Sequence, residues 1–135
     1  MAQIADRHRL VILAIVDVIV LALVTVYGFA VHGTLQTAGQ RLPATLLPVI
    51  FGWFVVAPFL GAYNLDQMQH WSQLWRPTYA MVLAAPLAAV LRGLALNMPI
   101  IPIFVVVLGG ISALAILAWR AVYKLLFLRA RETYG

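Results

Sequence analysis

Residues 10–31 are the most informative stretch of the chain, and their sequence is LVILAIVDVIVLALVTVYGFAV. These 22 residues contain one charged side chain, Asp17. A helix of about 20 apolar residues crosses the hydrocarbon layer of a bilayer, so this stretch is long enough to span a membrane. Its basic start and the small residues of Gly28-Phe29-Ala30 resemble a signal peptide, but the apolar core of a signal peptide has only about 7–15 residues. We therefore expect a retained transmembrane helix.

Three more apolar stretches follow, at about residues 46–63, 77–96 and 100–128. None alternates polar and apolar residues with the period of two that indicates a strand. Of the 135 residues, 64% are hydrophobic and 10% are charged, whereas soluble domains have about 45–50% and about 25%. A soluble core of this length cannot bury so much apolar surface. The sequence predicts an all-α polytopic membrane protein: residues 1–135 as one bundle of four transmembrane helices, with spans at about 10–31, 46–63, 77–96 and 100–128.

Positive charge is distributed unequally between the two ends of this predicted bundle. With four spans, both termini and the loop between the second and third spans share one side. That side carries Arg7, Arg9, Arg76, Arg129 and Arg131, with Arg120 and Lys124 near it, and the opposite side has Arg41 and Arg92. The excess predicts cytoplasmic N- and C-termini in a multi-pass protein of the cell membrane. The same side is expected to carry an interfacial aromatic belt of Trp71, Trp75, Trp119 and Tyr123, beside Arg120 and Lys124 as interfacial anchors.

Small and polar residues share one face on three of the predicted spans. In the first span that stripe is Asp17, Leu21, Thr25, Gly28 and His32, at about 100° per residue. In the third it is Ala84, Ala88 and Arg92, and in the fourth Gly109, Ser112, Ala113, Ile116 and Arg120. Small residues at this spacing let helices pack closely. We predict a buried polar seam composed of Asp17, Thr25, His32, Arg92, Ser112 and Arg120.

Asp17 needs a partner or a task, because a charge inside a membrane helix costs at least about 2.5 kcal/mol. In depth it lies about 10 Å from Arg120 and about 12 Å from Arg92. Arg92 can extend outward to water, whereas Arg120 can reach toward Asp17 if the long fourth helix tilts. We therefore predict an Asp17–Arg120 ion pair. A proton or cation site at Asp17, and an anion or headgroup clamp at Arg92, remain open alternatives.

Short motifs along most of the chain resemble one known family. They are Asp17, Tyr27-Gly28, His32-Gly33, Leu47-Pro48, Gly52-Trp53, Ala57-Pro58-Phe59-Leu60-Gly61, Leu91-Arg92, Pro102-Ile103-Phe104-Val105 and Ala118-Trp119-Arg120. Together they are similar to a small four-helix prokaryotic membrane family, catalogued as domain of unknown function 3054, over about Ile12 to Tyr123. The resemblance implies the four-helix fold and the choice of notable residues. It implies no activity.

The sequence contains no recognisable enzyme motif. It lacks a nucleophile elbow, a His-Glu-x-x-His pair, a Walker loop and a dinucleotide-binding glycine motif. It has no cysteine, and His8, His32 and His70 are expected at membrane surfaces rather than around a haem or metal. The basic residues form no run that would indicate nucleic-acid binding. We expect a protein that is not an enzyme, with no catalytic residues, metal site or cofactor.

Two classes of function remain. The first is a non-catalytic accessory, assembly or scaffold subunit, whose partners are the lipid bilayer, other membrane proteins or a second copy of itself. The alternative is a small proton-coupled solute transporter, similar in outline to small multidrug transporters. Because one bundle of four thin helices encloses little volume, a solute pathway would need either a dimer or a gap between neighbouring helices, and we expect the dimer. Binding of a quinone or pigment is a third possibility, which rests only on an apolar interior with Tyr and Trp nearby.

Overall fold

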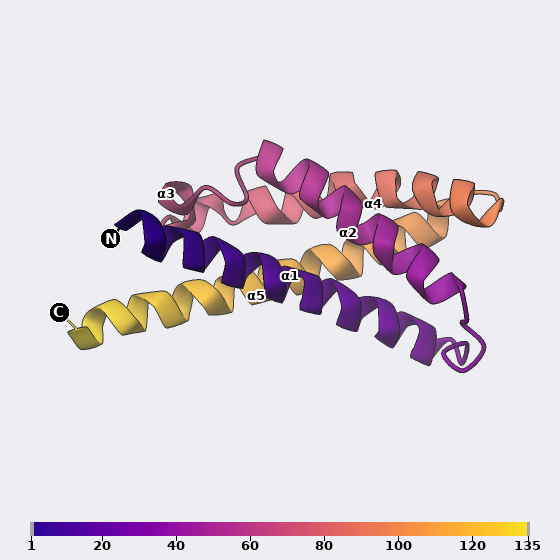
Figure 1. Ribbon diagram of the computed structural model, residues 1–135, viewed down its shortest axis with the longest axis horizontal. Helices are drawn as coiled ribbons and strands as arrows, with labels where there is room; N and C mark the ends of the chain where they lie inside the picture. The colour runs from indigo at the N-terminus through magenta and orange to yellow at the C-terminus, as the bar shows by residue number, and fades with distance from the viewer. Residues whose placement is uncertain (1, 135) are drawn as a thin grey trace.

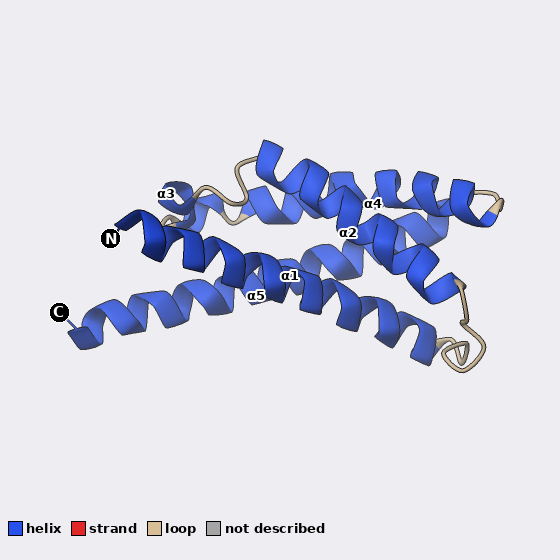
Figure 2. Cartoon of the chain, viewed as in Figure 1, coloured by secondary structure: helices blue, strands red, loops and turns tan. Residues whose placement is uncertain are grey.

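The structure, a computed structural model, describes the backbone of residues 2–134 and the side chains of residues 3–127 and 129. The described chain is helical, without strands (Figure 2). Its elements are α1 (Ala2–Val31), α2 (Arg41–Phe59), α3 (Leu65–Met68), a 3-10 turn η1 (Trp71–Gln73), α4 (Trp75–Leu96) and α5 (Pro102–Tyr134). The helices α1, α2, α4 and α5 are long and apolar enough to cross a membrane. The predicted all-α fold with four spans is confirmed.

The four long helices form an elongated bundle with both ends of the chain at one end of it (Figure 1). The short helix α3 lies at that same end, and the loops at residues 32–40 and 97–101 lie at the other. Helix α4 packs most extensively, against α2 on one side and α5 on the other. Helix α1 makes fewer contacts, with α2 and α5. The bundle therefore has a tight α2–α4–α5 part and a more loosely attached α1.

The bounds of the second span differ from the prediction of 46–63. Helix α2 begins earlier, at Arg41, because Pro43 lies in its first turn, where a backbone N–H has no helical partner. The helix ends earlier, at Phe59, just after Pro58. Gly61 then adopts a φ of 77°, a left-handed conformation that suits glycine and turns the chain away. Helix α5 extends beyond the predicted fourth span, to Tyr134, whereas its stretch that could cross a membrane is Pro102–Phe127.

Close packing around α4 depends on small side chains. Its buried positions are mainly alanines: Ala80, Ala84, Ala85, Ala88 and Ala89. A Cβ atom added to Gly52 of α2 would lie 3.0 Å from the backbone oxygen of Ala84, and one added to Gly109 of α5 would lie 2.8 Å from Cβ of Ala85. The predicted small-residue faces of α4 and α5 are therefore the faces on which these helices meet. The larger core side chains Leu21, Trp53, Met81 and Ile116 fill the space between helices.

Candidate functional site

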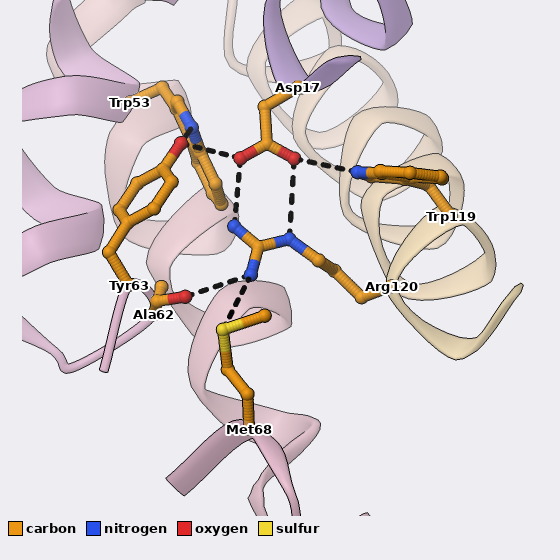
Figure 3. A network of polar contacts seen from close by, with 7 residues as sticks. All are labelled: Asp17, Trp53, Ala62, Tyr63, Met68, Trp119 and Arg120. Atoms are coloured by element: carbon orange, nitrogen blue, oxygen red, sulfur yellow. Dashed lines mark hydrogen bonds and ion pairs between the residues drawn. The ribbon is translucent and has the colours of Figure 1, made fainter. Parts of the chain in front are cut away.

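A buried ion pair joins α1 to α5. Asp17 is 0% exposed and Arg120 is 2% exposed. Arg120 donates from Nη2 to Oδ2 of Asp17 at 2.8 Å and from Nε to Oδ1 at 3.3 Å, so the pair is bidentate (Figure 3). The predicted Asp17–Arg120 pair is thus present. The planar guanidinium fork matches the carboxylate in the geometry that gives the strongest ion pairs.

Two aromatic side chains complete the hydrogen bonds of the Asp17 carboxylate. Trp119 donates from Nε1 to Oδ1 at 3.0 Å, and the hydroxyl of Tyr63 donates to Oδ2 (Figure 3). The Tyr63 oxygen in turn accepts from Nε1 of Trp53 at 2.8 Å. Each carboxylate oxygen therefore accepts two hydrogen bonds. Trp119, expected in an interfacial belt, points its indole N–H into the bundle instead, because the buried carboxylate offers an acceptor.

The Arg120 guanidinium is satisfied on all its nitrogens. Its Nη1 donates to the backbone oxygen of Ala62 at 2.8 Å and lies 3.7 Å from the sulfur of Met68. Its Cζ atom lies 5.0 Å from the centre of the Tyr63 ring. The network joins four helices, α1, α2, α3 and α5, and the segment between α2 and α3. A buried ion pair survives only when its remaining donors and acceptors are paired in this way.

Tyr63 acts as a fixed hydrogen-bond donor in this network. It lies beyond the end of α2, in the segment that leads to α3. Burial, followed by the neighbouring Asp17 carboxylate, raises the pKa of Tyr63 above its usual value. The phenol therefore keeps its proton at neutral pH. We call Asp17, Trp53, Tyr63, Trp119 and Arg120 the Asp17 network.

The other residues of the predicted seam do not join the Asp17 network. Thr25 donates to the carbonyl of Leu21 in its own helix at 2.8 Å. The buried Ser112 hydroxyl has no hydrogen-bond partner among the described residues. His32 is exposed, because it follows the last residue of α1. The residues of the predicted polar seam therefore lie in separate places, with Arg92 near the end of α4 and His32 outside the buried interior.

Lys124 lies one helical turn beyond Arg120 and is also buried, at 4% exposure. Its Nζ has no hydrogen-bond partner in the described part of the chain and lies 4.8 Å from the centre of the Trp71 ring. Lys124 was expected to be an interfacial anchor that reaches water. It is covered because the segment with α3 and η1 folds over this end of α5, which the helical pattern did not reveal.

A cavity of about 480 Å³ lies at the end of the bundle away from the termini, so the expectation that one bundle encloses little volume is wrong. All four long helices contribute to its walls, among them Thr25, Gly28, Thr45, Arg92, Phe104 and Ile111. Arg92 donates from Nε to the Thr45 hydroxyl at 2.8 Å, and its Cζ lies 4.8 Å from the centre of the Phe104 ring. Among the residues that the structure describes, no carboxylate lines the cavity. Sequence reasoning singled out Arg92 but missed Thr45, whose hydroxyl faces it from α2.

Neither region has the side chains of a metal centre. Among the residues that the structure describes, no three His, Asp or Glu side chains come together. The only acidic side chain of the Asp17 network is Asp17 itself, paired with Arg120. The network can hold helices in place, and the cavity can hold a ligand.

Comparison with known proteins gives a family. Residues 14–123 match the family described as "Protein of unknown function (DUF3054)". The chain matches none of the curated proteins and none of the solved structures with which it was compared. The match covers most of the chain, including the Asp17 network and the walls of the cavity. The protein is a multi-pass membrane protein that belongs to the DUF3054 family.

Proposed function

We propose that the protein is a non-catalytic membrane module, an accessory, assembly or scaffold subunit that packs on other membrane proteins or on itself. The observation that carries the proposal is the saturation of the Asp17 carboxylate. Arg120, Trp119 and Tyr63 occupy both of its oxygens. A carboxylate that exchanges protons during transport needs access to water in at least one state, and this one is 0% exposed. A structural role for the pair accounts for its burial.

The alternative is a small proton-coupled solute transporter that works as a dimer. The cavity of about 480 Å³ favours it, because the volume falls within the range of about 300–1,000 Å³ of small-molecule sites. Against it, Asp17 is not among the residues that line the cavity. It lies eight residues from Thr25, about 12 Å along α1. Direct coupling between a solute there and a proton on Asp17 would need the bundle to rearrange.

Purification and transport measurements together distinguish the two functions. The full chain would be extracted from its native membrane under mild conditions, and accompanying proteins identified by mass spectrometry. We expect a membrane protein partner in a fixed ratio. In proteoliposomes with a pH gradient, we expect wild type, Asp17→Asn and the exposed-site control Asp66→Asn to give the same proton flux as protein-free vesicles.

A different result would favour the transporter. That result is a lone homodimer with a solute-dependent proton flux that Asp17→Asn abolishes and Asp66→Asn leaves intact. Transport by a monomer in native-like lipid would contradict the dimer that the alternative requires.

We also propose that both termini face the cytoplasm, in the cell membrane. Arg7, Arg9, Arg76 and Arg129 belong to the end of the bundle that holds the termini, whereas Arg41 and Arg92 belong to the other. Basic residues are retained on the cytoplasmic side. The side chain of Arg131, counted in the same bias, lies outside the described residues. A reporter active only in the cytoplasm should work when fused to the C-terminus, and activity of a reporter that works only outside would reverse the orientation.

A further inference from the structure

Two arginines face the same cavity without an acidic partner. Arg41 is the first residue of α2, and Arg92 lies four residues before the end of α4. Both line the cavity of about 480 Å³, as does His32. Arg41 donates from Nη2 to the backbone oxygen of Thr37 at 3.1 Å. The described residues of the walls include no aspartate or glutamate, so this end of the cavity carries uncompensated positive charge.

The guanidinium of Arg92 is held in one orientation but is only partly used. Its Nε bonds to Thr45, and its plane lies beside the Phe104 ring. No hydrogen bond joins either Nη nitrogen to another residue in the described part of the chain. These two groups are the part of the fork that binds carboxylate or phosphate oxygens in pairs. Arg92 is therefore positioned to receive an anion, unlike Arg120, whose fork is filled by Asp17.

The rest of the cavity is apolar. Its walls away from the arginines include Val24, Val107, Leu108 and Ile111. Thr25 lies about 9 Å from the end of α1, and Ile111 about 14 Å from the start of α5. An empty space of this size would leave its apolar walls without dispersion contacts. The ligand that fits is thus an amphiphile, with an anionic group near the helix ends and an apolar chain that extends toward the middle of the membrane.

We propose that this cavity binds an anionic phospholipid. Its phosphate interacts with Arg92 and Arg41, and part of one acyl chain fills the apolar portion between α1 and α5. The positions of the two arginines near helix ends match the level of lipid headgroups, and the apolar walls lie at the depth of the chains. A lipid is present in large excess around any membrane protein, so a site of moderate affinity would be occupied. The proposal does not depend on whether the protein acts as a scaffold or as a transporter.

Two glycines make a matched test of the chain-binding part. Gly28 lines the cavity, and a Cβ atom added there meets nothing within 4 Å. A Gly28→Leu side chain would occupy cavity space without a clash at its Cβ, and leucine favours helix over glycine. Gly110 is exposed on α5, does not line the cavity and has equally open space at an added Cβ. Gly110→Leu is therefore the control for a leucine gained outside the site.

The experiment measures lipid retention by native mass spectrometry. The full chain in detergent is mixed with phosphatidylglycerol and phosphatidylcholine that have identical acyl chains, and the ratio of the bound lipids is recorded. We expect wild type to retain one phosphatidylglycerol with about a tenfold preference, the size expected for charge-assisted hydrogen bonds. Arg92→Gln should lose that preference. Gly28→Leu should lower retention of both lipids several-fold, and Gly110→Leu and the distant Arg7→Gln should behave as wild type.

Several outcomes would overturn the proposal. One is equal retention of the two lipids by wild type. Another is a preference that survives Arg92→Gln, and a third is retention that Gly28→Leu leaves unchanged. A non-lipid solute that co-purifies in a 1:1 ratio and is displaced by Gly28→Leu would assign the cavity to that solute instead. Because Gly28→Leu retains both arginines and strengthens its helix, the test stands even if Arg92→Gln folds poorly.

Discussion

Two intramembrane arginines have opposite environments: Arg120 lies near the middle of α5, and Arg92 lies near the end of α4. Arg120 is 2% exposed, pairs with Asp17 through two nitrogens and bonds a backbone carbonyl through the third. Arg92 is half-buried, bonds one threonine through one nitrogen and lines a cavity. Both sit on the small-residue faces of their helices, as the sequence pattern indicates. What separates them is the presence of an acid within reach.

A membrane-buried charge has a structural role when its partners are all internal. Around Arg120 the hydrogen bonds are complete, so a ligand there would have to displace protein groups. Around Arg92 they are incomplete, so a ligand would add bonds without breaking any. Ligand binding is therefore expected at the end of the bundle away from the termini, and a structural role is expected for the Asp17 network.

The largest expected effect on stability comes from replacing Arg120. Arg120→Gln leaves the Asp17 carboxylate buried without its cation, at a cost of about 3–5 kcal/mol in the free energy of unfolding. Arg92→Gln strands no acid and should cost less than about 1.5 kcal/mol, the value of an ordinary hydrogen bond. Denaturant unfolding of each variant in the same detergent measures the difference.

A double-mutant cycle separates the interaction energy between Asp17 and Arg120 from the effect of each single substitution on stability. Asp17→Asn combined with Arg120→Gln should be less destabilised than Arg120→Gln alone, because the stranded charge is removed with its partner. A coupling energy of zero between the two positions would contradict the difference between the two arginines. Arg120 would then contribute no more to stability through its partners than Arg92 does.

Tyr63→Phe tests whether hydrogen bonds from the aromatic side chains of the Asp17 network stabilise the fold. The variant loses a hydrogen bond to a carboxylate and leaves Nε1 of Trp53 without its acceptor. We expect a loss of about 1.5–3 kcal/mol, typical of hydrogen bonds to charged groups. Tyr79→Phe, at an exposed tyrosine of α4, is the control and should be nearly neutral.

The free energy of unfolding of wild type and of Tyr63→Phe should depend differently on pH. The pKa of Tyr63 is raised in the folded protein, chiefly by burial. Below the unfolded pKa of about 10, both states hold the proton and the contribution of Tyr63 is complete. As pH rises above that value, the unfolded chain releases its proton first, so stability falls. Wild type should therefore lose stability more steeply than Tyr63→Phe above pH 10 or so, and parallel curves would contradict the buried donor.

Glycine substitutions compare the packed part of the bundle with the open part. Gly109→Ala places a Cβ 2.8 Å from Cβ of Ala85, and overpacking of this kind costs about 1–3 kcal/mol. Gly28→Ala meets nothing within 4 Å and should gain about 0.5–1 kcal/mol from helix propensity. Thermal unfolding in detergent gives the sign of each change. If both substitutions stabilise the protein, α4 and α5 are not in tight contact at Gly109.

Replacing Lys124 should give a gain in stability of similar, small size. Its ammonium group is buried without a hydrogen-bond acceptor, which costs about 1–3 kcal/mol, and its contact with the Trp71 ring returns about 0.5–1 kcal/mol. Lys124→Met keeps the length and loses the charge, so we expect stabilisation of about 1 kcal/mol. The exposed Arg7→Met is a control for charge alone. Marked destabilisation by Lys124→Met would mean that a bound anion satisfies this lysine.

Much of the site could be reached from the sequence because lipid restricts what a helix can carry. A lone carboxylate in an apolar span demands a partner, and helical spacing places Arg120 on the correct face at an accessible depth. The Thr45 hydroxyl and the Tyr63 phenol gave no such signal. Threonine is common in membrane helices, and tyrosine at a span end reads as an interfacial residue. Their roles depend on contacts with Arg92 and Asp17, which lie 47 and 46 residues away along the chain.

The number of spans, the helical class and the faces that pack together follow from the sequence, because backbone hydrogen bonding and apolar length in a bilayer leave few alternatives. The sequence also indicates that Asp17 must be neutralised. Three features emerge only when the helices pack: the end of α2, the cover of the α3 segment over Lys124, and the cavity of about 480 Å³ beside Arg92. These features arise from the relative placement of side chains on four separate helices. Periodicity along one helix records which face is buried, but not how completely the neighbouring helices fill the space beside it.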